Sequence, residues 1–431
     1  MTVKAWILVF CATVIPTCKC DIYTRPPHEN AAAFARWLVH GQGRMWGVIS
    51  TTSLHLNGTA YGNVFDYSDG QIDNPTGRIF LFIDGLDYSP KDFKVNPFVS
   101  FTISEEVMGQ GCSADPEDPT CSKITLTGQI APVPQEDFNA SMQMFESRHP
   151  AAKYWQLHAD HDWVLYELHI TNIFLLDYYG GAKNIPVQDY YNASLIVQLH
   201  PANATQTCAA ALPKAKANPG SEALALSSAT PQPLSSTNVG ASLASARPWP
   251  LRYARFARWL VHGRTTPWGV LSTTSVHLEG TAFGNVQSHS DGPADKGTGR
   301  LFFYMTHLDA SCTDIQRNPK ASYTISENQM YCGGCFMDAE DPNCSKVILS
   351  GTMLPVTTND MNLARAALFS RHPSMETWPK GHGWVMYELK IENIFLLNHY
   401  GPGQSVDVDE YFAVDCPTHD PRLTDAFKTV V

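Results

Sequence analysis

The sequence predicts a mostly β protein, built as two tandem β-barrel domains with flanking helices. The first observation is a duplication: the segment Phe34-Ala35-Arg36-Trp37 recurs as Phe256-Ala257-Arg258-Trp259, at an offset of 222. The second is the alternation of apolar and polar residues in short segments, which is typical of strands. The third is a composition with 29 glycines, 29 prolines and 11% aromatic residues, which favours strands and turns. Because βαβ alternation is absent, we expect closed, mostly antiparallel barrels.

The repeat divides the chain into four segments. Residues 1–20 are predicted to be a secretory signal peptide, because Lys4 precedes an apolar run that is too short to span a bilayer. Residues 21–198 and 251–431 form the two repeated domains. Residues 199–250 are rich in Ala, Ser, Pro and Thr, so we expect a flexible linker there.

The elements of each domain follow from local patterns. Residues 31–40 place Phe34, Trp37 and Leu38 on one side of a helix, which Gly41 ends. Apolar alternation predicts strands over 46–53, 59–67, 77–84, 99–103, 124–130 and 163–179, the last with a bend at Asn172. A second helix is predicted over 136–147, and in the second domain Thr358-Asn359-Asp360 precedes the matching helix as its N-cap.

The charge balance excludes two classes of partner. The chain has 30 basic and 41 acidic residues, and loss of the two lysines of the signal peptide gives 28 − 41 = −13 for the mature chain. A nucleic-acid-binding protein needs a basic face to neutralise phosphates, and an anionic membrane surface makes the same demand. We therefore expect no nucleic-acid partner and no membrane partner.

The cysteines favour an oxidising compartment. Eleven are present, and the eight beyond the signal peptide are an even number. Two pairs bracket Asp- and Pro-rich loops at the same spacing of nine, and local disulfides are predicted for them: Cys112–Cys121 and Cys335–Cys344. The leftover partners are Cys312 with Cys332 and Cys208 with Cys416.

Five Asn-x-Ser/Thr sequons behind a signal peptide predict a glycoprotein. They are Asn57, Asn139, Asn192, Asn203 and Asn343.

Candidate catalytic groups are few. Arg-His-Pro at 148–150 and 371–373 could supply an anion clamp and an acid–base histidine. The favoured interpretation is structural: a charge at a helix C-terminus, a turn histidine and a helix stop. His40, His55 and His161 also recur in the second copy, but none has metal-ligand spacing, so no metal site is expected.

Two further motifs receive structural interpretations. Cys332-Gly333-Gly334-Cys335 is interpreted as a disulfide loop, because a thioredoxin-type motif needs a βαβ setting. Ser-Asp-Gly at 68–70 and 290–292 is interpreted as a turn between strands. No phosphate-binding glycine loop or nucleophile elbow is present.

Several stretches resemble the CREG family of secreted cellular-repressor glycoproteins. They are Trp46-Gly47-Val48 with the strand that follows, the Ser-Asp-Gly and Arg-His-Pro triplets, Asn-Ile-Phe-Leu-Leu at 172–176 and 393–397, and Tyr190-Tyr191-Asn192-Ala193-Ser194. The resemblance covers nearly all of both copies. It implies an FMN-binding split-barrel fold of pyridoxamine-phosphate-oxidase type for each copy. It also implies a secreted or endolysosomal, non-enzymatic glycoprotein delivered by mannose-phosphate receptors, with a loose link to growth and differentiation control; Asn192 matches the family's terminal sequon.

The resemblance also indicates where related barrels hold the flavin phosphate. The matching positions are 89–93 and 311–315, where Asp92 and Asp314 place a carboxylate against a phosphate. Lys91 could compensate in the first copy only. We therefore expect no FMN and no enzymatic activity, with an FMN-dependent oxidoreductase as the alternative. A third hypothesis, a nuclear repressor, conflicts with the signal peptide, the cysteine pairs and the negative charge.

Split barrels of this type, CREG proteins among them, generally form homodimers through the barrel face. A twofold interface uses the same patch on both subunits, so two fused copies can satisfy it within one chain. We therefore expect an intramolecular pseudo-dimer, in a protein that is extracellular or delivered to the lysosome lumen.

Overall fold

The computed structural model describes residues 23–41, 45–108, 111–155, 161–196, 248–263, 266–330, 335 and 337–417. The predicted signal peptide and residues 199–247 of the predicted linker lie outside the described residues, as do Asn203, Cys208 and Cys332. Both repeats belong to one compact unit, Ile22–Val197 with Trp249–Val431.

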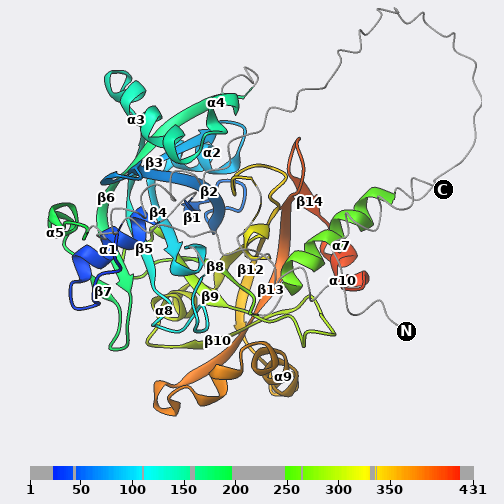
Figure 1. The fold of residues 1–431 in the computed structure, drawn as a ribbon. Helices are drawn as coiled ribbons and strands as arrows, with labels where there is room; N and C mark the ends of the chain where they lie inside the picture. The colour runs from blue at the N-terminus through cyan, green and yellow to red at the C-terminus, as the bar shows by residue number, and fades with distance from the viewer. Residues whose placement is uncertain are drawn as a thin grey trace, which may run out of the picture. The chain divides into compact units, whose positions relative to one another are not determined.

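The first repeat runs from α1 to α5 (Figure 1). Its elements are α1 (Ala31–His40), β1 (Met45–Thr52), β2 (Ala60–Gln71), β3 (Asn74–Asp84), α2 (Tyr88–Val95), β4 (Phe98–Ser104), β5 (Lys123–Pro132), α3 (Gln135–Arg148), α4 (Ala152–Trp155), β6 (Trp163–Leu176), β7 (Lys183–Asn184) and α5 (Val187–Asn192).

The second repeat has the same order of principal elements, from green to red in Figure 1. They are α7 (Pro248–His262), β8 (Trp268–Thr274), β9 (Ala282–Ser288), β10 (Leu301–Thr306), α8 (Ala310–Arg317), β11 (Lys320–Ser326), β12 (Lys346–Pro355), α9 (Met361–Arg371), β13 (Trp384–Leu397), β14 (Gln404–Val406) and α10 (Val408–Ala413). Short 3₁₀ turns lie at Glu105–Val107, Glu327–Gln329, Pro373–Thr377 and Lys380–His382.

The strands form antiparallel sheets, as predicted. In the first repeat the order is β3-β2-β1-β4-β5-β6-β7, and a further pairing of β3 with β6 closes a barrel. In the second repeat the order is β10-β13-β12-β11-β8-β9. There β9 and β10 are linked through an isolated bridge between Ser290 and Phe302, so this barrel is less completely closed.

Each barrel has an apolar interior that the first helix of its repeat covers. In the first repeat Phe34 and Leu38 of α1 pack with the inward side chains of the strands, such as Phe101 and Leu126. The third helix packs on the outside: Met142 and Phe145 of α3 contact Phe80 and Phe82 of β3, together with Leu165 of β6. Burying these two faces is the main stabilising term for each repeat.

The predicted helix over 31–40 is confirmed at both ends. Asn30 caps α1, because its side chain accepts a hydrogen bond from the Ala33 N–H. Gly41 ends the helix with a φ of 53°, and its N–H donates to the Trp37 carbonyl. Glycine suits this left-handed conformation because it lacks a Cβ.

Some local predictions need correction. Ser-Asp-Gly of the first repeat is not a turn: it lies within β2, where the register with β3 shifts between Ser68 and Gly70. The strand predicted over 163–179 is β6 and ends at Leu176, and its irregularity lies at Thr171, next to Asn172. A bulge of this kind accommodates one extra residue and re-aims the neighbouring side chains.

Two more features differ from the sequence expectation. Asp360 does precede α9, but its side chain makes no cap hydrogen bond and instead pairs with Arg300 at 2.9 Å. The helices α2 and α8 were not predicted, and they contain the segments 89–93 and 311–315. The side chains of Asp87 and Asp309 cap them. Among the described residues, none of the helices combines the length and the apolar character needed to cross a membrane.

Candidate functional site at the seam between the repeats

Reciprocal hydrogen bonds join the two repeats along a seam, which is the set of residues in contact between them. The Gly62 N–H donates to Ser322 Oγ, and the Gly284 N–H donates to Ser100 Oγ, both at 3.0 Å. Gly62 corresponds to Gly284 and Ser100 to Ser322 at the repeat offset of 222, so one contact is made twice in opposite directions. This reciprocity is the property of an isologous, twofold-type interface.

Two pairs in the seam join a residue to its own counterpart. Ser50 Oγ lies 2.8 Å from Ser272 Oγ. The Trp46 ring stacks on the Trp268 ring, with 6.1 Å between centroids and 15° between planes. Small apolar residues surround the tryptophans: Val48, Val64, Val270, Val286 and Ala339. The seam therefore has its own apolar core.

Both confidently predicted disulfides are present, and each closes a loop that reaches the other repeat. Cys112–Cys121 brackets Asp115 and Glu117. Cys335–Cys344 brackets Asp338 and Glu340. These four carboxyl groups are buried, which is unusual for acidic side chains without partners.

The histidines of the Arg-His-Pro triplets meet these loops. His372 Nδ1 lies 2.6 Å from Asp115 Oδ2, and His149 Nδ1 lies 3.2 Å from Asp338 Oδ1. As the structural interpretation of Arg-His-Pro predicts, Arg148 ends α3 and His149 is the C-cap residue of that helix. The sequence does not reveal the cross-repeat partner, because 189 residues separate His149 from Asp338.

Each disulfide loop and the histidine that meets it form a cluster, and one difference between the two clusters is at Asp66. In the first, the Asp66 carboxylate accepts hydrogen bonds from the main-chain N–H groups of Ala339, at 3.1 Å, and Glu340, at 3.0 Å. The matching residue at the repeat offset is Ser288. One half of the seam thus has a carboxylate where the other has a hydroxyl.

Ser288 makes a different set of contacts. Its hydroxyl donates to Asp115 Oδ1 at 2.5 Å, and its N–H donates to Glu117 Oε2 at 3.1 Å. In the first cluster, Glu340 Oε2 has no hydrogen-bond partner within the part of the chain that the structure describes. Exchanging aspartate for serine therefore changes both the charge and the hydrogen bonding of the cluster.

Each cluster also holds a buried lysine, and burial shifts the pKa values of the charged groups. Lys123 Nζ donates to the Glu117 carbonyl at 2.8 Å, and Lys346 Nζ lies 3.3 Å from the Glu340 carbonyl. Burial lowers the pKa of Lys123 and raises the pKa of Glu117 and Glu340 well above the usual range. It also raises the pKa of Asp66 to about 6.

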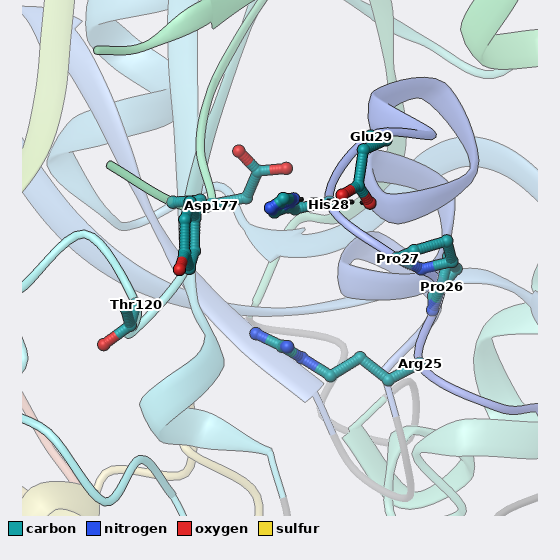
Figure 2. A pocket seen from close by; sticks show the side chains of 8 residues that line it. Arg25, Pro26, Pro27, His28, Glu29, Thr120 and Asp177 are labelled. Atoms are coloured by element: carbon teal, nitrogen blue, oxygen red, sulfur yellow. Dashed lines mark ion pairs between the residues drawn. The ribbon is translucent and has the colours of Figure 1, made fainter. Parts of the chain in front are cut away.

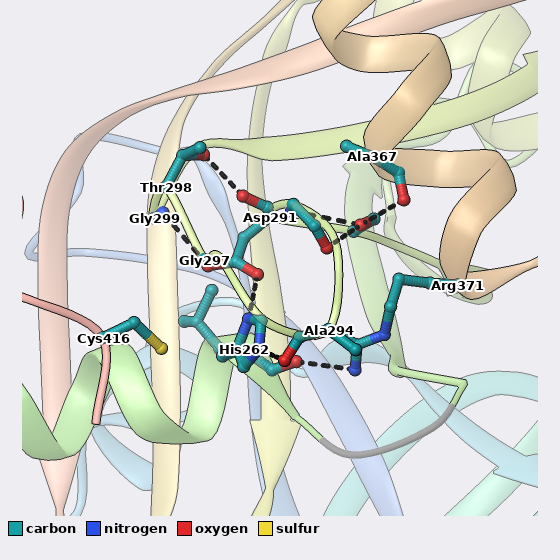
Figure 3. A network of polar contacts seen from close by, with 12 residues as sticks. His262, Asp291, Ala294, Gly297, Thr298, Gly299, Ala367, Arg371 and Cys416 are labelled. Atoms are coloured by element: carbon teal, nitrogen blue, oxygen red, sulfur yellow. Dashed lines mark hydrogen bonds and ion pairs between the residues drawn. The ribbon is translucent and has the colours of Figure 1, made fainter. Parts of the chain in front are cut away.

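A second polar network, within each repeat, contains the Ser-Asp-Gly motif. In the first repeat His40 Nδ1 lies 2.7 Å from Asp69 Oδ1, and Arg148 Nη2 donates to the His40 carbonyl at 2.8 Å. Figure 3 shows the same arrangement in the second repeat, where His262 Nδ1 lies 2.6 Å from Asp291 Oδ1. The motif therefore fixes the end of the first helix against the helix that precedes Arg-His-Pro.

The second network also contains a thiol. Ligand-type atoms of His262, Asp291 and Cys416 lie within 4.8 Å of one another, and Figure 3 shows the three side chains together. Burial raises the pKa of Cys416 to about 12, so the nucleophilic thiolate is disfavoured. When α5 is aligned with α10, Leu195 of the first repeat corresponds to Cys416. This arrangement supplies no activated nucleophile.

The segments matched to the flavin-phosphate position do not fit a phosphate. Asp92 Oδ2 accepts from Thr51 Oγ1 at 2.7 Å, and Asp92 Oδ1 accepts from the Leu54 N–H at 2.9 Å. Lys91 Nζ donates to the Leu86 carbonyl at 2.8 Å.

The second repeat preserves this arrangement. Asp314 accepts from Thr273 Oγ1 at 2.7 Å and from the Val276 N–H at 2.8 Å. In both repeats a carboxylate thus takes local donors that a phosphate would need, and its charge opposes a bound anion.

A surface pocket of about 260 Å³ lies in the first repeat (Figure 2). Its lining is Arg25, Pro26, Pro27, His28, Glu29, Thr120, Asp177 and Tyr178. Arg25 pairs with Glu105 at 3.0 Å, and Asp177 accepts from Lys183 at 2.9 Å. These charges are engaged in the fold, and we assign the pocket no function.

The described sequon asparagines differ in exposure. Asn57 lies in the turn before β2, Asn139 on α3 and Asn192 at the end of α5, and all three are exposed. Asn343 is half-buried, its Nδ2 donates to Asp341 Oδ1 at 3.1 Å, and the next residue forms a disulfide.

The two less certain cysteine pairings are not formed, because Cys312 and Cys416 are free thiols. Cys312 Sγ lies 3.8 Å from the Tyr387 hydroxyl, within the core of the second barrel. Because its side chain lies in this core, Cys312 packs there as a small apolar residue.

The sequence and the fold are similar to those of known proteins. The family model described as "CREG, beta-barrel" matches residues 26–192 and 248–413. Protein CREG2 of Homo sapiens is 39% identical over 187 residues, which cover 43% of this chain and 64% of that protein. Protein CREG1 of Homo sapiens is 38% identical over 164 residues, which cover 37% of this chain and 74% of that protein. A solved heme-binding protein from Mycobacterium smegmatis is 18% identical, with a TM-score of 0.32 over 40% of this chain and 62% of that chain.

Two antiparallel barrels joined by a reciprocal seam define a tandem β-barrel protein. Because the family model matches both repeats, the chain belongs to the CREG beta-barrel family. The matched part spans a little under two thirds of the first curated relative.

Proposed function

We propose that the protein is a secreted or endolysosomal glycoprotein of CREG type that acts by being bound, without catalysis. A mannose-phosphate receptor is the partner class for its delivery, and growth or differentiation control is the process in which it acts. Membership of the CREG family and three exposed sequons support this proposal.

The observation that carries the proposal is the pair of carboxylates at Asp92 and Asp314. Both accept hydrogen bonds from a threonine hydroxyl and a main-chain N–H. An anion placed beside them would meet like charge and find those donors engaged. Neither segment therefore offers a favourable binding site for a flavin phosphate.

The test combines a search for flavin with receptor capture. Protein purified from secreting cells should show no visible flavin band after gel filtration. It should bind an immobilised mannose-phosphate receptor, and enzymatic removal of N-glycans should abolish that binding. A stoichiometric flavin that survives gel filtration would establish the alternative, an FMN-dependent oxidoreductase. If removal of N-glycans left binding to the receptor unchanged, the proposal that glycans mediate this binding would be contradicted.

A further inference from the structure

The cluster around Asp66 in the seam holds more acidic than basic side chains. Asp66, Asp338 and Glu340 are 1%, 3% and 8% exposed, and they gather at His149 and Lys346. With the three carboxyl groups ionised and Lys346 charged, these groups sum to −3 + 1 = −2. Burying such a charge without compensation is strongly unfavourable.

The matching cluster carries one negative charge fewer. With its histidine likewise counted as neutral, Asp115, Glu117 and Lys123 sum to −2 + 1 = −1. The nearby aspartates are alike in the two halves: Asp87 acts on the first cluster and Asp309 on the second. The difference in charge therefore arises from Asp66, which stands where the second cluster has Ser288.

The two histidines differ in one distance only. His149 Nε2 lies 2.8 Å from the Tyr67 carbonyl, as His372 Nε2 lies 2.8 Å from the His289 carbonyl, and this contact fixes a proton on Nε2 and turns Nδ1 toward the aspartate. Metal-binding histidines commonly have this second hydrogen bond to a carbonyl. His149 Nδ1 and Asp338 Oδ1 are 3.2 Å apart, close to the ~3.3 Å between two ligands of a tetrahedral zinc ion with bonds of about 2.0 Å. The corresponding 2.6 Å between His372 and Asp115 fits a shared proton only.

We propose that Asp66, His149 and Asp338 bind one divalent transition-metal ion of the zinc class, with the carboxylate of Glu340 beside them. Ligand atoms of the first three lie within 4.8 Å of one another. Glu340 Oε2 is buried and has no hydrogen-bond partner among the described residues, so it is available to a cation. Imidazole and carboxylate ligands suit zinc and its neighbours. Since the ligands come from both repeats and are buried, the ion would enter on folding and tie the repeats together.

The test is the metal content of the full-length secreted protein. It is produced in zinc-supplemented medium, purified without chelators and measured by inductively coupled plasma mass spectrometry. We expect one zinc ion per chain in the wild type and none in Asp66→Ser, which copies the other half. Ser288→Ala, at the matching position, should keep the ion. Ser288→Asp should bind a second one.

Circular dichroism and disulfide mapping report whether each variant is folded. A folded wild type without metal overturns the proposal, as does an Asp66→Ser variant that keeps its ion, because the ion would then lie elsewhere. If Asp66→Ser is not secreted, the wild-type stoichiometry and Ser288→Asp decide the question. In addition, wild type refolded with zinc should melt at a higher temperature than wild type refolded with EDTA, whereas an equal melting temperature counts against the site.

Discussion

His372 and Asp115 lie 2.6 Å apart, although they belong to different repeats and 257 residues separate them in the sequence. Burial by itself would raise the pKa of Asp115, but the hydrogen bond and attraction of His372, with the hydrogen bonds from Ser288 and the Glu117 N–H, outweigh it and lower the pKa below its usual value. The pair is therefore a buried polar contact between the repeats. It links the disulfide loop of the first repeat to the end of α9 in the second.

Asp115→Asn should destabilise the protein strongly. It removes one partner of the buried contact with His372, and breaking one side of a buried pair costs about 3–5 kcal/mol. The control is Glu392→Gln in the pair with Lys320, whose side chains are both 46% exposed, where a loss of about 0–1 kcal/mol is expected. Urea denaturation measures both values. Equal losses in the two variants would show that the seam pair has no special role.

The double variant Cys112→Ser/Cys121→Ser should unfold more easily than the wild type. Opening a loop of this length costs about 2–3 kcal/mol in the chain-entropy account. It also loosens the segment that holds Asp115 against the other repeat. Cys416→Ser is the matched control, because Cys416 is a free thiol. The interpretation fails if denaturation midpoints of the two variants coincide.

The stability of the protein should depend on pH through Glu106. Burial raises the pKa of Glu106 to about 7; Asp115 and Glu105 add to this, whereas the Cys112 N–H and Lys123 oppose it. Because the folded pKa exceeds the unfolded value, the stabilisation is complete below about pH 4.3 and is lost as the pH rises through about 7.

The check is urea denaturation from about pH 5 to about pH 8. Glu106→Gln should remove part of the decline that the wild type shows over this range. Glu136→Gln, at an exposed position on α3, serves as control and should keep the wild-type profile. Identical profiles for Glu106→Gln and wild type would refute the assignment.

We propose that the seam persists in solution, so that the chain is a compact monomer. A Cβ at Gly284 would lie 2.5 Å from Thr102 Oγ1 of the other repeat, so Gly284→Ala should weaken the seam by about 1–3 kcal/mol. Gly381→Ala, where nothing lies within 4 Å, is the control. Small-angle scattering and light scattering measure the shape and mass. An extended two-lobed wild type, or a dimer of chains, would contradict the proposal.

Glycopeptide mapping should find N-glycans at Asn192 and at some of Asn57, Asn139 and Asn203. Asn343 should be poorly occupied, because its amide donates to Asp341 and a disulfide follows it directly. Full occupancy of Asn343 with an empty Asn192 would be the opposite of this expectation.

The sequence predicts the features that depend on neighbouring residues. The apolar face and the caps of residues 31–40 are local, and so is the spacing of nine between the cysteines of each disulfide loop. The duplication itself could be read directly, and with it the presence of two barrels.

Features that depend on distant contacts could not be predicted. Asp69 is buried because His40 and Arg148 surround it, which no local pattern indicates. The helix α2 has a proline and few apolar residues, so its cap at Asp87 and the contacts of Asp92 with β1 decide its form. Asp66 looks like an ordinary strand residue until the loop of the other repeat supplies its partners.

Fusion of the two copies also changes what mutation can do. In a homodimer encoded by one short gene, a substitution at a twofold interface appears on both sides at once. Here Asp66 and Ser288 occupy equivalent places yet are encoded separately, as are Leu195 and Cys416. Each half can therefore acquire a side chain on its own, while the other half keeps a different contact and maintains assembly.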